Sequence, residues 1–197
     1  MQKTLFLLAS ILLLSFISVK EEPIDQLDVK GPLKFDNVNF KLAWAAHPKD
    51  AYYVQEYLPE AEKLANFKQM LTLNLFVTDI EVKDAVAQKT SELTKRKETD
   101  AMCNYKVNES PDGKEFIVDF LMGESKDNKM TVAEFNVYRY KQIELAAGKK
   151  AILVYAYSKR AYGNDITAFL NTLGENRKAY LNQMISTALP QIRIAKE

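Results

Sequence analysis

The sequence predicts an α+β fold: a twisted, mostly antiparallel sheet of about seven strands with helices packed on it, as an α/β/α sandwich. Three observations predict this class. Apolar and polar residues alternate in many short segments between residues 35 and 157, and such alternation indicates strands with one buried face. The connections between these segments are short, which favours antiparallel neighbours. Helical periodicity is confined to one segment near the middle and one near the C-terminal end.

The first residues have the layout of an export signal. Lys3 precedes an apolar run from about Leu5 to Val19, and a charged break follows at Lys20. This is typical of a secretory signal peptide, so we expect residues 1–19 to be removed by cleavage near Ser18. The run is short for a membrane span, and an uncleaved anchor is the alternative. We therefore expect an exported protein, periplasmic or secreted, with no membrane span after cleavage.

Residues 20–34 contain two prolines, one glycine and many charges. This composition predicts a linker, and residues 35–197 are then a single α+β domain. The chain has 27 basic and 26 acidic residues, so removal of Lys3 with the leader leaves 26 of each. A neutral protein has no general electrostatic attraction for nucleic acid or anionic lipid, and we expect neither as a partner.

The first two predicted strands form a hairpin. From Val38 to Ala46 apolar residues take alternate positions, Trp44 among them, while His47 has the opposite parity. We predict that Trp44 is buried in the core. We also predict that a turn over residues 48–50 leaves His47 exposed at the tip, and that residues 51–59 return as the second strand.

The remaining elements follow in order. Residues 60–66 predict a helical turn, and Met70–Val77 predicts a strand whose leucines face inward. A helix is expected next, because Thr78 and Glu81 have the spacing of a capping box. Four strands are expected near residues 102–107, 115–122, 130–143 and 150–157, and the last is apolar on both faces and therefore central. A second helix is expected over residues 165–190, with a short strand after it.

The motifs of common enzyme classes are missing. The sequence has no glycine-rich phosphate loop and no G-x-S-x-G elbow. With one histidine, His47, and one cysteine, Cys103, we expect no metal site, no cofactor and no catalytic residues. We interpret Cys103 as a small buried residue; as a nucleophile it would have only His47 as a histidine partner. Glutamates such as Glu56 and Glu60 are expected to be solvated rather than to form a glycosidase-like pair.

Tyrosines supply the candidate binding residues. They cluster on three predicted strands, at Tyr52, Tyr53, Tyr57, Tyr138, Tyr140, Tyr155, Tyr157 and Tyr162. If they share one face they line a ligand groove or partner surface; otherwise they pack beneath the helices. We select Tyr53, Gln55 and Tyr57 as ligand contacts, because they share one parity and the polar Gln55 suits a half-exposed face. The opposite parity of this strand is an equal alternative.

The segment Gln55–Leu73 resembles a pattern in small secreted bacterial proteins of unknown function. In that pattern a Glu-Tyr-Leu/Val-Pro strand end precedes an aromatic-x-x-Met-Leu/Ile-Thr strand. Phe67 stands here where tryptophan is expected, and Met70, Leu71 and Thr72 follow it. The order of strands and helices is similar to the Mog1/PsbP fold, whose members are mostly non-catalytic binding or assembly factors. The resemblance implies no catalytic residues for this sequence.

These features predict a non-catalytic binding or assembly module of the cell envelope. Its expected partner is an envelope protein or a small apolar or glycan ligand, bound at an aromatic-lined sheet edge or groove. The alternative is a small exported hydrolase that acts on envelope polymers. A pocket in which polar groups with perturbed pKa values converge would favour the hydrolase.

Overall fold

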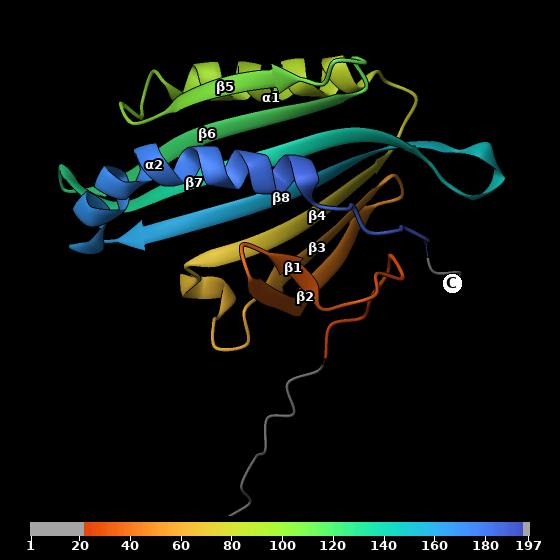
Figure 1. Ribbon diagram of the computed structural model, residues 1–197, viewed down its shortest axis with the longest axis horizontal. Helices are drawn as coiled ribbons and strands as arrows, with labels where there is room; N and C mark the ends of the chain where they lie inside the picture. The colour runs from red at the N-terminus through yellow and green to blue at the C-terminus, as the bar shows by residue number, and fades with distance from the viewer. Residues whose placement is uncertain (1–21, 195–197) are drawn as a thin grey trace, which may run out of the picture.

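The computed structural model describes residues 22–194, which form one eight-stranded sheet and two α-helices (Figure 1). The predicted signal peptide lies outside the described residues. The strands are β1 Leu33–Phe35, β2 Val38–Lys49, β3 Tyr52–Leu58, β4 Gln69–Val77, β5 Asn104–Glu109, β6 Glu115–Lys126, β7 Lys129–Glu144 and β8 Lys150–Tyr162. The α-helices are α1 Val82–Arg96 and α2 Asp165–Ser186, and short 3-10 helices form at Leu64–Asn66 and Ala146–Gly148. The order across the sheet is β1-β2-β3-β4-β8-β7-β6-β5, with every neighbouring pair antiparallel.

The predicted α/β/α sandwich is wrong. The sheet curls into a half-barrel instead of lying flat between two helical layers (Figure 1). α1 packs on one face against β5, β6 and β7, and α2 packs on the opposite face against β7 and β8. Two helices therefore cover one half of the sheet, while strand twist and the register shifts in β2–β3 and β6–β7 supply the curl. We call the α2 side the inner face and the α1 side the outer face.

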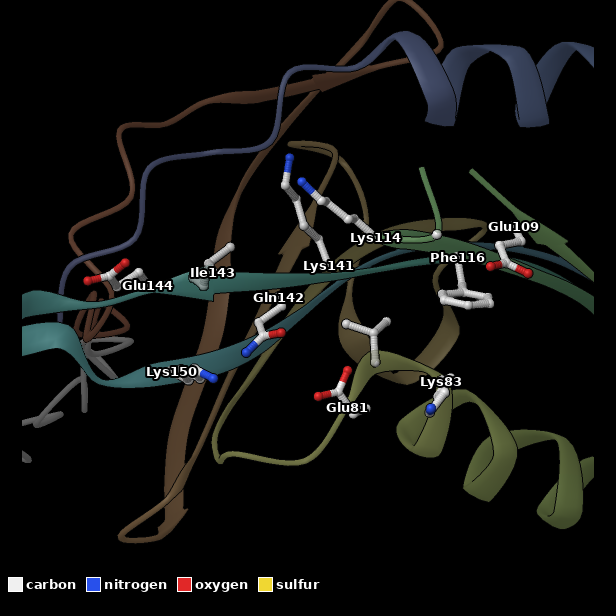
Figure 2. Close-up of a pocket in the computed structure, with 12 residues that line it drawn as sticks. Glu81, Lys83, Glu109, Lys114, Phe116, Lys141, Gln142, Ile143, Glu144 and Lys150 are labelled. Atoms are coloured by element: carbon white, nitrogen blue, oxygen red, sulfur yellow. The ribbon is translucent and has the colours of Figure 1, made fainter. Parts of the chain in front are cut away.

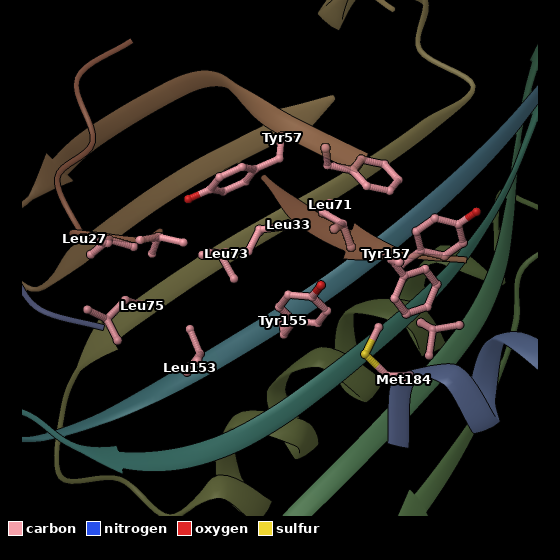
Figure 3. Close-up of a cluster of buried hydrophobic side chains, with 14 of the residues drawn as sticks. Leu27, Leu33, Tyr57, Leu71, Leu73, Leu75, Leu153, Tyr155, Tyr157 and Met184 are labelled. Carbon is pink, nitrogen blue, oxygen red and sulfur yellow. The ribbon is translucent and has the colours of Figure 1, made fainter. Parts of the chain in front are cut away.

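The main core lies on the inner face (Figure 3). Leu71, Leu73 and Leu75 of β4 face inward as predicted, and all three are fully buried. Tyr180 and Met184 of α2 pack on the same cluster. β8 is buried along both faces, as its two-sided apolar pattern predicted, because it lies between β4 and β7 near the middle of the sheet. Burial of this continuous apolar surface is the main stabilising contribution to the fold.

Residues 22–32, which we call the strap, cover the inner face beside β3. The sequence assigned them to a linker, but Leu27 is fully buried and Val29 is 7% exposed, both in the main core. Ile192 near the C-terminal end packs on the same core, and the Arg193 backbone N–H donates to the Leu27 carbonyl at 2.9 Å. The strand expected after α2 is not formed up to residue 194.

The helix ends differ from their predictions. α1 begins at Val82 with Glu81 as N-cap, and no side chain caps it. The hydroxyl of Thr78 instead accepts from the Ile80 backbone N–H at 3.3 Å, so the predicted capping box is wrong. α2 continues through Gly174 as one helix. Between residues 22 and 194, no helix is both long and apolar enough to cross a membrane.

Candidate ligand-binding site

The predicted hairpin of β2 and β3 is confirmed, but a bulge changes which side chains face outward. Leu42 pairs with Tyr57, whereas Trp44 pairs with Glu56, so the register shifts between them. An extra residue in one strand reverses the alternation beyond it. Trp44 consequently lies on the outer face and is 41% exposed. The prediction that Trp44 belongs to the core is wrong.

His47 does not lie at an exposed turn tip. β2 continues to Lys49, so His47 is a strand residue on the inner face. Its ring stacks on Tyr53, with 3.9 Å between ring centroids and an interplanar angle of 11°. The strand extends past the proline because Pro48 lies on β2 where the ladder to β3 is already irregular, and a bulged position tolerates a missing N–H.

Tyr53, Gln55 and Tyr57 share one parity, on the inner face. Gln55 is fully buried and Tyr57 is 1% exposed, while Tyr53 packs against the main core. The Gln55 amide Nε2 donates to Asp25 Oδ1 of the strap at 2.8 Å. Burial raises the pKa of the Tyr57 phenol, and the nearby Asp25 carboxylate and Tyr155 raise it further. The strap thus covers the residues that the sequence selected as ligand contacts, and they form no open groove.

The side chains of the opposite parity of β3 lie on the outer face, in a part of the sheet away from the strands against which α1 packs. Tyr52 stacks on Phe76 of β4 at 4.7 Å between centroids, and its hydroxyl donates to Asn74 Oδ1 at 2.8 Å. Phe76 is 38% exposed. Glu56 lies on the same face opposite Trp44. We call Trp44, Tyr52, Glu56, Asn74 and Phe76 the outer aromatic face.

The outer aromatic face is elongated along the strands. Trp44 pairs with Glu56 at one end, while Tyr52 pairs with Phe76 at the other. Glu56 lies four positions after Tyr52 on β3, which is about 13 Å at the rise of a β-strand. Polar groups of Glu56 and Asn74 lie along the same face as the rings. This arrangement can contact an extended ligand at both ends, with Glu56 as a hydrogen-bonding group at the Trp44 end and Asn74 as one between the ends.

Glu56 occupies an unusual electrostatic position. Burial raises the pKa of its carboxyl group, and the positive charge of Arg160 on β8 opposes that shift. Arg160 is itself ion-paired with Glu134 of β7 and lies over the Phe67 ring, 4.1 Å from the centroid. The Glu60 carboxylate instead accepts from Lys41 at 2.8 Å, and this hydrogen bond lowers its pKa. Glu56 and Glu60 therefore have different environments rather than one shared site.

A buried polar network supports Arg160 from below. Asn136 donates to Glu134 Oε1 at 2.9 Å, and Ser158 donates to Asn136 Oδ1 at 2.6 Å. Asn136 is fully buried and Ser158 is 4% exposed. Because each member is hydrogen-bonded, the network fixes the direction of the Glu134 carboxylate and thereby of the guanidinium.

An open cavity of about 510 Å³ lies between the start of α1, the β5–β6 turn and the adjoining ends of β7 and β8 (Figure 2). It is lined by Glu81, Val82, Lys83, Glu109, Gly113, Lys114, Phe116, Lys141, Gln142, Ile143, Glu144 and Lys150. The ends of Lys114 and Lys141 lie close to one another in Figure 2, and Lys141 also pairs with Glu115 at 2.7 Å. The lining has both signs of charge and one aromatic ring. None of the predicted contact residues lines this cavity.

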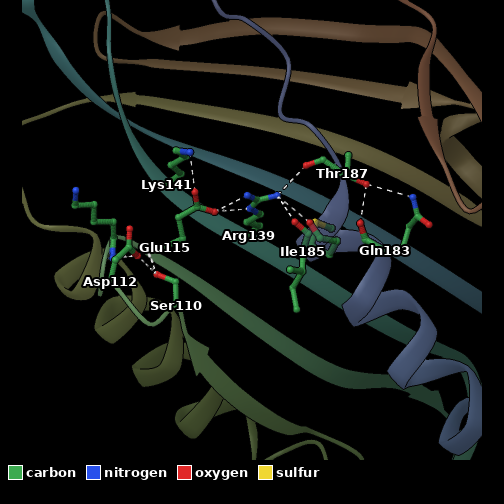
Figure 4. A network of polar contacts seen from close by, with 10 residues as sticks. Ser110, Asp112, Glu115, Arg139, Lys141, Gln183, Ile185 and Thr187 are labelled. Carbon is green, nitrogen blue, oxygen red and sulfur yellow. Dashed lines mark hydrogen bonds and ion pairs between the residues drawn. The ribbon is translucent and has the colours of Figure 1, made fainter.

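Arg139 joins the sheet to the end of α2 (Figure 4). Its Nε donates to Glu115 Oε2 at 2.6 Å, and its Nη1 donates to the carbonyls of Met184 and Thr187, each at 2.9 Å. The last carbonyls of a helix have no partner within the helix, and a cation there is favourable. Arg139 therefore has a structural role, as the cap of α2.

Cys103 and His47 are not brought together. Cys103 is buried in the cluster beneath α1 on the outer face, where its thiol donates to the Leu93 carbonyl at 3.5 Å, whereas His47 stacks on Tyr53 on the inner face. Burial raises the pKa of the Cys103 thiol, and Asp100 adds to this. The described part of the chain contains no group of side chains that could hold a metal ion.

Sequence reasoning missed Trp44 and Phe76 as exposed residues. The exposure of Phe76 could have been predicted from the sequence, because the inward leucines of β4 place position 76 on the opposite parity. The exposure of Trp44 could not have been predicted, because the face on which it lies depends on a bulge that involves two strands. The tyrosines, considered together, occupy both faces and line no common groove.

Comparison with known proteins gives one finding. A protein-family model matches residues 27–189, and its description assigns no function. No curated protein matches the chain. The matched range begins at Leu27, the first fully buried residue of the strap.

Proposed function

The chain belongs to this uncharacterised family, and from that premise we propose that it is an exported, non-catalytic binding module of the cell envelope that binds a glycan along its outer aromatic face. Export is proposed from the signal-peptide layout of residues 1–19. N-terminal sequencing of the protein from envelope and medium fractions tests it, and recovery of the intact chain only from the cytoplasm would contradict it.

The observation that carries the glycan proposal is the pairing of exposed rings with polar groups on an uncovered sheet. Trp44 and Phe76 are both more than a third exposed, at opposite ends of the outer aromatic face. Flat rings supply contact area for the apolar faces of sugar rings. The Glu56 carboxylate accepts hydrogen bonds, and the Asn74 amide nitrogen can donate while its oxygen binds Tyr52. A linear polymer of sugars matches this spacing of rings and polar groups.

Binding is tested with the mature protein and soluble envelope glycans, namely peptidoglycan fragments and chito-oligosaccharides. Trp44 is the only tryptophan, so its fluorescence reports contact directly, and calorimetry gives the affinity. Trp44→Ala and Phe76→Ala are each expected to weaken binding about ten-fold or more, a change of about 1.4 kcal/mol. Trp44→Ala is also expected to destabilise the fold by less than the loss of about 3–5 kcal/mol that is typical of a fully buried aromatic residue, because Trp44 is 41% exposed.

Phe116→Ala in the cavity of Figure 2 is the matched control, and we expect it to leave the affinity unchanged. Loss of binding in Phe116→Ala with retention in Trp44→Ala would move the site to that cavity. An unchanged fluorescence spectrum with every glycan would contradict the proposal. Capture of an envelope protein through Trp44 instead would favour the protein-partner alternative.

One observation favours the hydrolase as a second candidate. Glu56 combines a carboxyl pKa raised by burial with a neighbouring Arg160 that is paired to a second carboxylate, Glu134. Glycosidases use two carboxyl groups whose environments separate their pKa values. Release of new reducing ends from the bound glycan, lost in Glu56→Gln, would identify a hydrolase. Binding without product release in the unmodified protein supports the binding module.

A further inference from the structure

We propose that the strap closes over a second binding site, which holds one small, neutral, hydroxyl-rich ligand such as a single sugar unit against the inner face of β2 and β3. This site is independent of the outer aromatic face, because the side chains of β3 that form it have the opposite parity. It uses the residues that the sequence selected, Tyr53, Gln55 and Tyr57, together with His47 and the strap.

Unpartnered polar atoms point to a ligand here. Within residues 22–194, four buried side-chain atoms have no hydrogen-bonding partner: Gln26 Oε1, His47 Nε2, Gln55 Oε1 and Tyr57 Oη. They belong to the strap and to the inner face of the β2–β3 hairpin that the strap covers. Gln55 is fully buried and Tyr57 is 1% exposed. Leaving a buried polar group unpaired is unfavourable, and apolar side chains at these positions would avoid that cost.

The chemistry of these atoms selects the ligand. Amide oxygens accept hydrogen bonds, an imidazole nitrogen donates or accepts according to its tautomer, and a phenol hydroxyl donates or accepts. A molecule with several hydroxyl groups can donate to the acceptors and accept from Tyr57. The parallel rings of His47 and Tyr53 supply a flat surface beside them.

Asp25 excludes an anion from this place. Its carboxylate accepts from the backbone N–H groups of Leu27 and Val29 at 3.0 and 2.8 Å and from Gln55 Nε2 at 2.8 Å. Its charge already raises the pKa of Tyr57, so it is felt at the hydroxyl. A second negative charge would be repelled, and a neutral ligand fits.

The strap is attached in a way that permits opening. Residues 22–32 belong to no strand, so no β-ladder holds them. The attachments are Leu27 and Val29 in the core, the Asp25–Gln55 hydrogen bond, the Arg193 N–H to the Leu27 carbonyl, and an exposed ion pair between Arg193 and Asp28 at 4.0 Å. Asp28 has a φ of 49°, which is uncommon for a residue other than glycine. Opening therefore breaks few hydrogen bonds, and its main cost is the exposure of Leu27 and Val29. It lets the four buried atoms reach solvent or ligand.

Tyr57→Phe tests the closed state by removing only the unpartnered hydroxyl. Hydrogen exchange of the Arg193 amide, which donates to the Leu27 carbonyl of the strap, measures strap opening in the mature protein. We expect Tyr57→Phe to slow this exchange about ten-fold, equivalent to about 1.4 kcal/mol, because the closed strap no longer buries an unpaired group. Tyr157→Phe is the matched control: its hydroxyl donates to Gln69 Oε1 at 2.9 Å, so strap exchange should not slow.

The ligand is tested by NMR titration with glucose and N-acetylglucosamine. We expect shifts at His47, Tyr53 and the Gln55 side-chain amide, with about ten-fold weaker binding in Tyr57→Phe and unchanged binding in Trp44→Ala. If Trp44→Ala no longer binds longer glycans, it should still bind the single sugars at this second site. Either proposal can therefore be contradicted without the other. Unchanged or faster strap exchange in Tyr57→Phe, which indicates a hydroxyl satisfied by ordered water, overturns the proposal. No shift with either sugar also overturns it.

Discussion

At the scale of the residue, one bulge decides which aromatic side chain meets solvent. The register shift between Leu42 and Trp44 transfers the tryptophan from the expected core parity to the outer face, opposite Glu56. The residues beyond the bulge change side with it, and His47 meets Tyr53 on the inner face. A local irregularity thus places an exposed ring beside a half-buried carboxyl group.

Glu56→Gln should stabilise the protein near neutral pH. The pKa of Glu56 in the folded protein is raised by burial, with Arg160 opposing the shift. Its contribution to stability is therefore fully present below the carboxyl pKa of the unfolded chain and is lost as pH rises through the folded pKa. We expect a higher unfolding midpoint for the glutamine variant at pH 7, and convergence of the two proteins at about pH 3, below the ordinary glutamate pKa of about 4.3.

Urea melts across this pH range measure the effect. Glu60→Gln is the control, because Glu60 is exposed and its pKa is lowered by the Lys41 hydrogen bond. It should show the opposite pH trend. Destabilisation by Glu56→Gln at pH 7 would mean that Arg160 stabilises the Glu56 carboxylate more than burial destabilises it.

At the scale of the element, α2 depends on a side chain from the sheet. Its C-terminal carbonyls have an external partner, Arg139 of β7, which is anchored by Glu115 of β6. α1 lacks a side-chain cap at its start and is held by its apolar stripe of Val82, Val86 and Leu93. The two helices are therefore fixed by different means, one by a partly buried guanidinium and one by packing.

Arg139→Met should destabilise the fold by about 1.5–3 kcal/mol, because it removes one of the two cations paired with the partly buried Glu115 carboxylate and the partner of the last α2 carbonyls. The Arg139 side chain is only 12% exposed. Urea melts measure the loss, and hydrogen exchange should show fraying of the last turn of α2. Lys141→Met, at a position 41% exposed, should cost about 1 kcal/mol or less.

The destabilisation by Arg139→Met should also depend on pH. Burial raises the pKa of Glu115, but the hydrogen bonds from Lys141 and Arg139 outweigh it and the pKa is lowered overall. The stabilisation is present above the carboxyl pKa of the unfolded chain and is lost as pH falls through the lowered folded value. The difference between the native protein and Arg139→Met should therefore shrink in acid. A constant difference would show that the arginine acts mainly through the α2 carbonyls.

At the scale of the whole molecule, segments outside the helices complete the inner face of the half-barrel. The strap, β1 and the residues after α2 pack on the same core as α2 itself (Figure 1). The strap and the C-terminal segment also join through Arg193 and Leu27. The folding unit therefore begins before residue 35, where the composition suggested that a linker ended.

A chain that begins at Phe35 should not fold stably. It lacks Leu27, Val29 and Leu33, each 8% exposed or less, and burial of one such side chain contributes about 1.5–3 kcal/mol. The combined loss approaches the whole stability of a typical domain, about 5–15 kcal/mol. Circular dichroism and thermal melts compare it with a chain that begins at Lys20. A cooperative melt at the native midpoint would show that the strap is dispensable.

The sequence by itself determined the order of the elements and much of their burial. The hairpin, the inward leucines of β4, the central place of β8 and the two helices all follow from periodicities within single segments. Such periodicities record which face of one element is apolar. They placed the predicted contact residues on β3 but could not choose between its two faces, because both parities carry aromatic and polar residues.

Only the tertiary structure decided which of those parities meets solvent. The face of Trp44 depends on a bulge between two strands, and the burial of Gln55 depends on Asp25, thirty positions away in the chain. The curl of the sheet likewise depends on how eight strands twist together and on where two helices can pack. Periodicity within a segment carries no information about these contacts, because each is made between segments that meet only in the folded chain.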